Sequence, residues 1–190
     1  MTDEPARSAT LFAARYAREH GLTVSYDPNL RRNLWSDEQT ARQYIREGLN
    51  LCDVAKLSDE ECTFLCGDGE IDALGHRLLA EHPNLKLLFV TCGAGGSYAF
   101  CGSRMAFVPG FSVKIADTTG AGDAFVGAVL YQILRRGGLR EAYSPAELEQ
   151  LLTFGNAVGA LSVQRYGAIP AIPTLAETES FLHAQGLLGA

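Results

Sequence analysis

The sequence is short of positive charge and of long apolar runs. Its 190 residues carry 16 Lys and Arg against 22 Asp and Glu, so the formal net charge is −6. This acidic balance argues against a nucleic acid or an anionic membrane as the main partner. The longest apolar runs, 85–90 and 157–163, are far shorter than the ~20 residues that cross a bilayer. Neither a nucleic-acid nor a membrane partner is therefore expected.

The sequence also lacks a secretory leader and a cysteine pattern typical of disulfides or zinc. Residues 1–10 have no basic segment followed by an apolar core. The cysteines are odd in number and include no CxxC pair, which predicts reduced, buried thiols in a cytoplasmic protein. They are Cys52, Cys62, Cys66, Cys92 and Cys101.

What is present is the alternation of helices and strands that is typical of an α/β protein. Apolar residues make up 47% and charged residues 20%, and the length predicts a single domain over 1–190. The pattern favours a mostly parallel sheet covered by helices on both faces. Helices are expected at 5–20, 36–52, 58–66, 70–82, 121–136, 144–165 and from 174, and strands at 22–26, 53–57, 85–90, 97–100, 104–108 and 111–115. Capping residues are expected at the helix starts Ser36, Ser58, Ser144 and Thr174.

The strongest chemical feature is the glycine-bearing turn at residues 117–125, DTTGAGDAF. Glycines at a helix start let the backbone approach a ligand, and the free N–H groups of the first turn favour an anion. Asp123 in that turn is either a helix-capping acid or a general base beside the anion site. The P-loop and dinucleotide motifs are excluded, because no lysine follows these glycines and Phe125 stands where the last glycine would be.

The segment DTTGAGDAFVGA resembles the signature of the ribokinase-like (PfkB) carbohydrate kinases. The resemblance implies a three-layer α/β/α fold with a mostly parallel sheet, and an enzyme that transfers the γ-phosphate of ATP to a sugar hydroxyl. It implies that the backbone of Gly120, Ala121 and Gly122 forms the anion hole. Asp123 would take the proton from the sugar hydroxyl, which is the chemistry that phosphoryl transfer requires.

Three further segments are expected at the nucleotide and its Mg²⁺. The family likeness implies that Glu61 organises Mg²⁺ through water and that Ser58 stands at the position of a family asparagine. These two residues also form a capping box, and both roles can coexist. Thr91, Gly93 and Gly96 would line ATP, although an ordinary hairpin turn explains them as well. Asn156 would lie near adenine, with a solvated mid-helix asparagine as the alternative.

A monovalent cation such as K⁺ is implied beside the glycine turn. The residues that the resemblance assigns to it supply one carboxylate and mainly main-chain oxygens, which are the ligands that hard cations take. They are Asp117, Thr119, Ser162, Arg165 and Gly167.

The substrate is expected at the segment after the strand at 22–26. Asn29 and Arg31 would reach the phosphates or the sugar, since an arginine fork suits phosphoryl oxygens. The alternative is a plain Asp-Pro-Asn turn with a surface arginine. The segment YDPNLR at 26–31, followed by Leu34 and Trp35, resembles the fructokinase branch of the family. This resemblance implies fructose as the sugar, and 2-keto-3-deoxygluconate kinases carry a related segment.

The resemblance covers only the C-terminal two-thirds of a usual family member. The N-terminal strands, the β lid and most sugar-binding segments have no counterpart in these 190 residues. A non-catalytic nucleotide-binding fragment is therefore the alternative to an active kinase. The intact protein is expected to be a homodimer.

Overall fold

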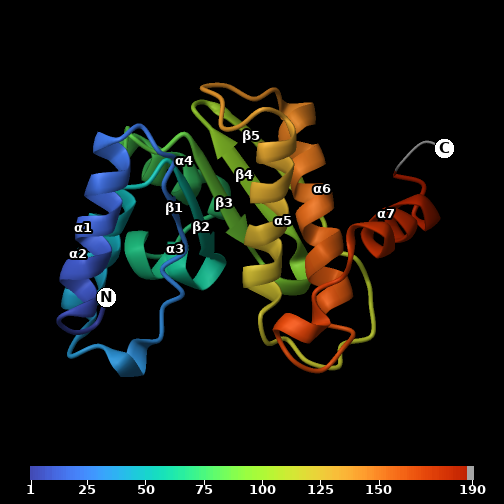
Figure 1. Cartoon of the computed structure of the whole chain (residues 1–190), viewed down its shortest axis with the longest axis horizontal. Helices are drawn as coiled ribbons and strands as arrows, with labels where there is room; N and C mark the ends of the chain where they lie inside the picture. The colour runs from blue at the N-terminus through green and yellow to red at the C-terminus, as the bar shows by residue number, and fades with distance from the viewer. Residues whose placement is uncertain (188–190) are drawn as a thin grey trace. The chain divides into compact units, whose positions relative to one another are not determined.

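A computed structural model describes residues 1–187, and Figure 1 labels its elements. One five-stranded sheet has the order β1-β2-β3-β4-β5. Strand β1 pairs with β2 in parallel, with Ser25 opposite Val54, whereas β4 and β5 are joined by two residues, a link that only antiparallel strands allow. The elements are α1 (Ala6–Glu19), β1 (Ser25–Tyr26), η1 (Arg32–Leu34), α2 (Glu38–Leu49), β2 (Val54–Ser58), α3 (Asp59–Cys66), α4 (Ile71–Glu81), β3 (Leu87–Thr91), η2 (Gly93–Gly95), β4 (Ser97–Cys101), β5 (Arg104–Val108), α5 (Ala121–Arg135), α6 (Pro145–Ser162), η3 (Ile169–Ala171) and α7 (Leu175–Ala184).

The contacts within the chain divide it into two compact units. Unit 1 comprises residues 1–90 and 100–105, and unit 2 comprises residues 91–99 and 106–190. Because strands β4 and β5 each contribute residues to both units, the division follows packing rather than the order of the chain.

Unit 1 has a core of aliphatic side chains from its helices and strands. Ile45, Leu49, Leu57, Leu78 and Leu87 are all at most 1% exposed. Strand β2 is buried along four of its five residues, and β3 likewise, which is the pattern of strands covered on both faces. The continuous apolar run at 85–90 predicts β3, and that strand is confirmed.

Unit 2 is built on the pairing of α5 with α6, which lie side by side in Figure 1. Gly155 lets the helices approach closely, because a Cβ there would lie 2.7 Å from the Phe125 ring. Ala124, Ala128 and Ala157 are buried in the same core cluster. Small residues on the facing sides of both helices therefore set their close packing.

Two local predictions are wrong. Residues 111–115 form no strand; the segment follows Gly110 as a loop, and Phe111 packs edge-on against Phe181 at 5.0 Å between ring centroids. Helix α2 is capped by the Asp37 side chain, which accepts from the backbone of Thr40 at 2.8 Å, rather than by Ser36. A carboxylate at the true N-cap position outcompetes the neighbouring hydroxyl for the first-turn N–H groups.

The predicted capping boxes at Ser58, Ser144 and Thr174 are all present. The helix expected over 144–165 ends earlier, at Ser162, and the strand expected over 22–26 is reduced to Ser25–Tyr26. Over residues 1–187, no helix is both long and apolar enough to span a membrane.

Candidate functional site

The glycine turn in unit 2 ends in a helix start that lacks a side-chain cap. Gly120 is the N-cap of α5 and adopts the left-handed conformation, with φ +78°. Its Cα faces Ala168, and a Cβ at Gly120 would lie 3.0 Å from the Ala168 Cβ. Helix α5, like α1 and α4, has no side-chain cap at its N-terminus, whereas α2, α3, α6 and α7 each have one. The first turn therefore leaves N–H groups for a ligand, with the positive end of the helix dipole behind them.

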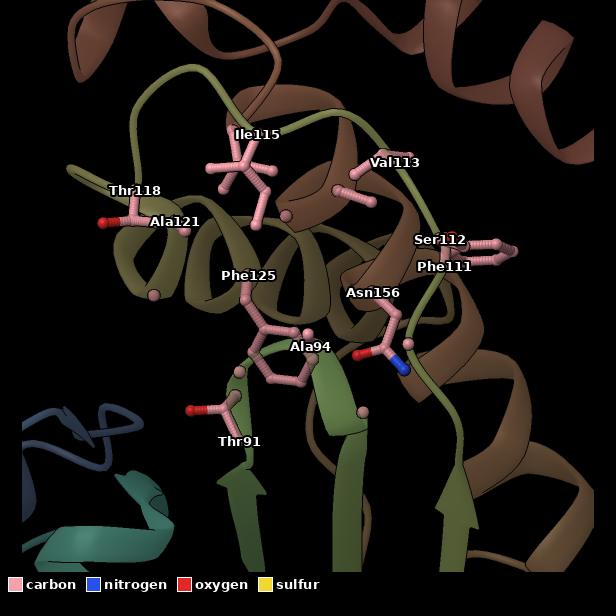
Figure 2. Close-up of a pocket in the computed structure, with 17 residues that line it drawn as sticks. Thr91, Ala94, Phe111, Ser112, Val113, Ile115, Thr118, Ala121, Phe125 and Asn156 are labelled. Carbon is pink, nitrogen blue, oxygen red and sulfur yellow. The ribbon is translucent and has the colours of Figure 1, made fainter.

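A cavity of about 430 Å³ lies entirely within unit 2, against this helix start. Figure 2 shows Ala121 and Phe125 on α5, Asn156 on α6, and Thr91 and Ala94 at the strand side. Such a volume suits a small-molecule ligand. Of the predicted site residues, the cavity brings together Thr91, Gly93, Gly96, Ala121, Gly122 and Asn156.

The side chain of Asp123 does not line that cavity. Asp123 is exposed and lines a second, apolar cavity of about 300 Å³, together with Tyr131 and Phe154. The first turn of α5 thus presents Ala121 and Gly122 to one cavity and the Asp123 carboxylate to the other. No side-chain capping hydrogen bond is present at the start of α5, and the role of Asp123 as a general base stays a prediction.

Asp117 ties the glycine turn to the loop after α6. One carboxylate oxygen, Oδ1, accepts from Thr119 N at 2.9 Å and from Thr119 Oγ1 at 2.7 Å, and the other accepts from Gly167 N at 3.1 Å. The Val163 carbonyl accepts from the backbone N–H of both Ala116 and Asp117. The Thr119 side chain and backbone, together with Gly167, lower the pKa of Asp117, so the carboxylate stays ionised.

The structure therefore brings together Asp117, Thr119 and Gly167 of the five residues assigned to a monovalent cation. The hydroxyl of Ser162 donates to the Gly159 carbonyl at 2.8 Å, and Arg165 donates to Glu177 at 2.5 Å, so neither side chain turns to Asp117. No cluster of three or more His, Cys, Asp or Glu within residues 1–187 could hold a metal ion. A cation here would take main-chain oxygens and one carboxylate.

In unit 1, Glu61 uses both carboxylate oxygens on backbone groups. One oxygen accepts from Ser58 N at 2.8 Å and the other from Leu30 N at 2.6 Å. Glu61 is only 7% exposed, so these charge-assisted bonds are shielded from water. The predicted capping box is thus one half of the role of Glu61, and holding the loop after β1 is the other.

A second carboxylate holds the same loop. Asp27 accepts from Asn29 N at 3.1 Å and from Lys56 Nζ at 3.3 Å. Burial raises the pKa of Asp27, and the Lys56 ammonium opposes part of that rise. Lys56 was not predicted as a site residue, although a lysine inside the apolar run 53–57 is a signal that could have marked it.

The predicted substrate residues lie on this loop. Asn29 adopts φ +47°, a left-handed conformation that asparagine tolerates better than most residues. Arg31 is exposed, and among residues 1–187 its guanidinium donates only to the neighbouring Leu30 carbonyl, at 3.2 Å. The loop is held by its backbone, which leaves the side chains of Asn29 and Arg31 at the surface.

Comparison with known proteins places these features in a family. A family model for the pfkB family carbohydrate kinases matches residues 1–175. Fructokinase-2 of Solanum lycopersicum is 43% identical over 94% of this chain and 54% of its own length. The fructokinase of Solanum tuberosum is 45% identical over 94% of this chain and 52% of its own length. The chain thus spans about half the length of the curated relatives it matches.

Solved structures give the same result for the fold. Fructokinase from Xylella fastidiosa with bound ATP matches with a TM-score of 0.87 at 34% identity, over 98% of this chain and 59% of that one. Fructokinase from Vibrio cholerae O395, in its form with fructose, ADP and calcium ion, matches with a TM-score of 0.84 at 36% identity, over 95% of this chain and 57% of that one. The predicted α/β ribokinase-like fold is confirmed. The chain belongs to the pfkB family of carbohydrate kinases.

Proposed function

We propose that the protein is part of an ATP-dependent sugar kinase whose substrate is fructose. The observation that carries the proposal is the uncapped N-terminus of α5, which opens on a cavity of about 430 Å³ with Gly120 at φ +78°. Relatives that are 43% and 45% identical are fructokinases. A kinase needs such a site because backbone N–H groups can stabilise charge on the transferred phosphoryl group.

In this proposal the residues of the glycine turn divide the chemistry. The backbone of Gly120, Ala121 and Gly122 holds the phosphoryl oxygens of ATP. The Asp123 carboxylate accepts the proton of the sugar hydroxyl while that oxygen bonds to the γ-phosphorus. The bond from the γ-phosphorus to the bridging oxygen of ADP breaks, and ADP leaves. Thr91, Gly93 and Gly96 line the nucleotide site.

Two cations belong to this proposal. Glu61, whose oxygens accept from the backbone of Ser58 and Leu30, is proposed to act toward Mg²⁺ through water, and Ser58 caps the same helix. Mg²⁺ bound with ATP would neutralise phosphate charge. Asp117, held beside Gly167 at 3.1 Å, suits a monovalent cation such as K⁺ together with main-chain oxygens of Thr119, Ser162 and Arg165. The K⁺ site is tested by titrating the protein with K⁺ alone, and the Mg²⁺ role by titrating it with Mg²⁺ in the presence of ATP.

Asn29 and Arg31 are proposed to contact the substrate or the transferred phosphate. The αL backbone at Asn29 and the exposed guanidinium of Arg31 support this role. A 2-keto-3-deoxygluconate substrate would suit the same arginine, because the sugar acid carries a carboxylate. Comparing turnover with the two sugars separates the candidates.

The test is sugar-dependent ADP formation by the purified protein. Asp123→Asn is expected to lower kcat by at least about 100-fold, the size typical of a lost general base, and to leave the Kd for ATP unchanged. Asp72→Asn is the matched control, since Asp72 is also an exposed acid in the first turn of a helix. Turnover of the Asp123→Asn variant at the wild-type rate would overturn the assignment of Asp123.

A second candidate function is nucleotide binding without turnover. It is favoured by one observation: the cavity and the helix start both lie in unit 2, whereas the chain spans 54% of a fructokinase relative. Calorimetry that detects ATP binding, combined with no fructose-dependent ADP release, would select this candidate. Sustained turnover would exclude it.

A further inference from the structure

Both polar atoms of the Asn156 side chain form hydrogen bonds with the protein. Its Oδ1 accepts from Ser97 Oγ at 2.7 Å, and its Nδ2 donates to the carbonyls of Val108 and Pro109 at 3.0 and 3.3 Å. Ser97 is fully buried. Asn156 sits in the middle of α6, a position where a solvated amide was one expectation. That expectation is wrong, because a network joins α6 to the start of β4 and to the end of β5.

The orientation of this amide follows from its partners. Carbonyl oxygens can only accept, so the group facing Val108 and Pro109 must be the NH₂. The NH₂ group thus donates to Val108 and Pro109, and the amide oxygen accepts from the Ser97 hydroxyl. The protein itself therefore engages both polar atoms of the Asn156 side chain.

The segment held by Asn156 is a wall of the 430 Å³ cavity. Gly110, Phe111, Ser112 and Val113 line the cavity on this side, and Figure 2 shows Asn156 facing the stretch with Phe111 and Ser112. Asn156 itself lines the same cavity. A hydrogen bond to this segment therefore acts on the shape of the site.

Two glycines show that the segment seats closely on the turn before β4. A Cβ at Gly96 would lie 2.2 Å from the Val108 carbonyl oxygen, and a Cβ at Gly110 would lie 2.4 Å from the Ala94 carbonyl oxygen. The backbones are thus in direct contact. Asn156 on α6 bonds to Ser97 on β4 and to the Val108 carbonyl, and these hydrogen bonds hold the two backbones together.

We propose that Asn156 and Ser97 are positioning residues for the nucleotide site, and that Asn156 does not select the base. The pair fixes residues 108–113 as a preformed wall, and the base binds by shape and apolar contact against it. The inference rests on the proposed nucleotide site. It predicts that loss of the pair weakens all purine nucleotides equally, because the wall and not a base-specific hydrogen bond is lost.

The test is calorimetric Kd measurement for ATP and for GTP on the purified 190-residue chain. Asn156→Asp sets a carboxylate against two carbonyl oxygens and is expected to weaken both nucleotides about tenfold, in line with the loss of buried hydrogen bonds. Ser97→Ala keeps the Nδ2 bonds and is expected to weaken both about threefold. The ratio of the two Kd values is expected to stay within about twofold of wild type.

Hydrogen exchange on the ligand-free chain gives an independent measurement. Backbone amides of residues 110–113 are expected to exchange faster in the Asn156→Asp variant, while amides of α4 in unit 1 keep their wild-type rates. Gln150→Ala is the matched control, since Gln150 lies on the same helix but does not line the cavity. Among the described residues, its side chain accepts a hydrogen bond from Arg136 at 3.0 Å. It is expected to change neither Kd nor exchange.

Two results would overturn the proposal. A Kd ratio that changes more than about fivefold would mean that Asn156 reads the base. Unchanged exchange at residues 110–113 in the Asn156→Asp variant would mean that the clamp does not hold the wall. A wild-type chain that binds neither nucleotide would instead refute the proposed function, and exchange would still decide the clamp. If the Asn156→Asp variant does not fold, Asn156→Ala, which removes the bonds to Val108 and Pro109 without adding a charge, carries both measurements.

Discussion

The loop after β1 in unit 1 and the turn before β4 in unit 2 are held in opposite ways. The first is held by side chains: Glu61 accepts from Leu30 N at 2.6 Å, and Asp27 accepts from Asn29 N at 3.1 Å. The second is held by backbone contact, since Gly96 has no room for a Cβ beside the Val108 carbonyl. Carboxylates fix the backbone of the loop after β1, whereas the absence of a side chain at Gly96 allows the close backbone contact before β4.

The difference separates two kinds of site residue. In unit 1 Glu61, which the sequence marks as functional, uses both carboxylate oxygens on backbone N–H groups, and the groups left at the surface are Asn29 and Arg31. In unit 2 the backbone of Gly120 and its neighbours is itself the proposed binding group. A glycine motif can therefore predict a ligand site formed by the backbone. A buried acid can predict one only after its hydrogen bonds to the protein are known.

The largest expected effect comes from filling the backbone contact in unit 2. Gly96→Ala places a Cβ 2.2 Å from a carbonyl oxygen at φ +114°, and we expect it to lower the free energy of unfolding by about 3–4 kcal/mol. Gly93→Ala is the control in the same turn: its φ is +55° and nothing lies within 4 Å, so about 1 kcal/mol is expected. Equal effects in urea unfolding would contradict the close backbone contact.

The next effect comes from removing the carboxylate in unit 1. Glu61→Ala leaves the N–H groups of Ser58 and Leu30 without their acceptor in a site that is 7% exposed, and we expect a loss of about 2–4 kcal/mol. Glu61→Gln keeps one acceptor oxygen and is expected to cost less. Glu60→Ala, an exposed neighbour, is the control, with an expected change within about 0.5 kcal/mol. A loss in Glu60→Ala as large as in Glu61→Ala would show that the effect belongs to the helix terminus in general.

The smallest effect is expected at the exposed capping box of Thr174 and Glu177 on α7, which we compare with the buried box of Ser58 and Glu61 on α3. Hydrogen bonds from Arg165 and from Thr174 lower the pKa of Glu177 from 4.5 to about 2. A lowered carboxyl pKa stabilises the folded state above the ordinary pKa, and that stabilisation disappears as the pH falls through the folded pKa. Glu177→Gln is thus expected to be slightly less stable than wild type at pH 7 and equally stable near pH 2.

The pH series is checked by urea unfolding between pH 7 and pH 2. The wild-type advantage over Glu177→Gln is expected to decline between pH 4.5 and about 2, as Glu177 gains its proton. An advantage that stays constant over this window would mean that shape, and not charge, explains the cap.

The starts of three helices could be predicted from the sequence because their causes are local. Ser58, Ser144 and Thr174 are followed three residues later by glutamate, and each box is present in the structure. The strand expected at 111–115 is absent for a non-local reason: Phe111 packs against Phe181, and this contact cannot be read from alternation within five residues.

The α/β class, the capped helices and the glycine turn with Asp123 all follow from the sequence alone, because propensity, capping and φ > 0 positions are properties of a few neighbouring residues. The roles of the polar side chains, in contrast, depend on the tertiary fold. It directs Glu61 to Leu30, Lys56 to Asp27 and Asn156 to Val108. These partners are 29 to 48 residues apart in the chain, so only folding brings a buried donor and its acceptor together.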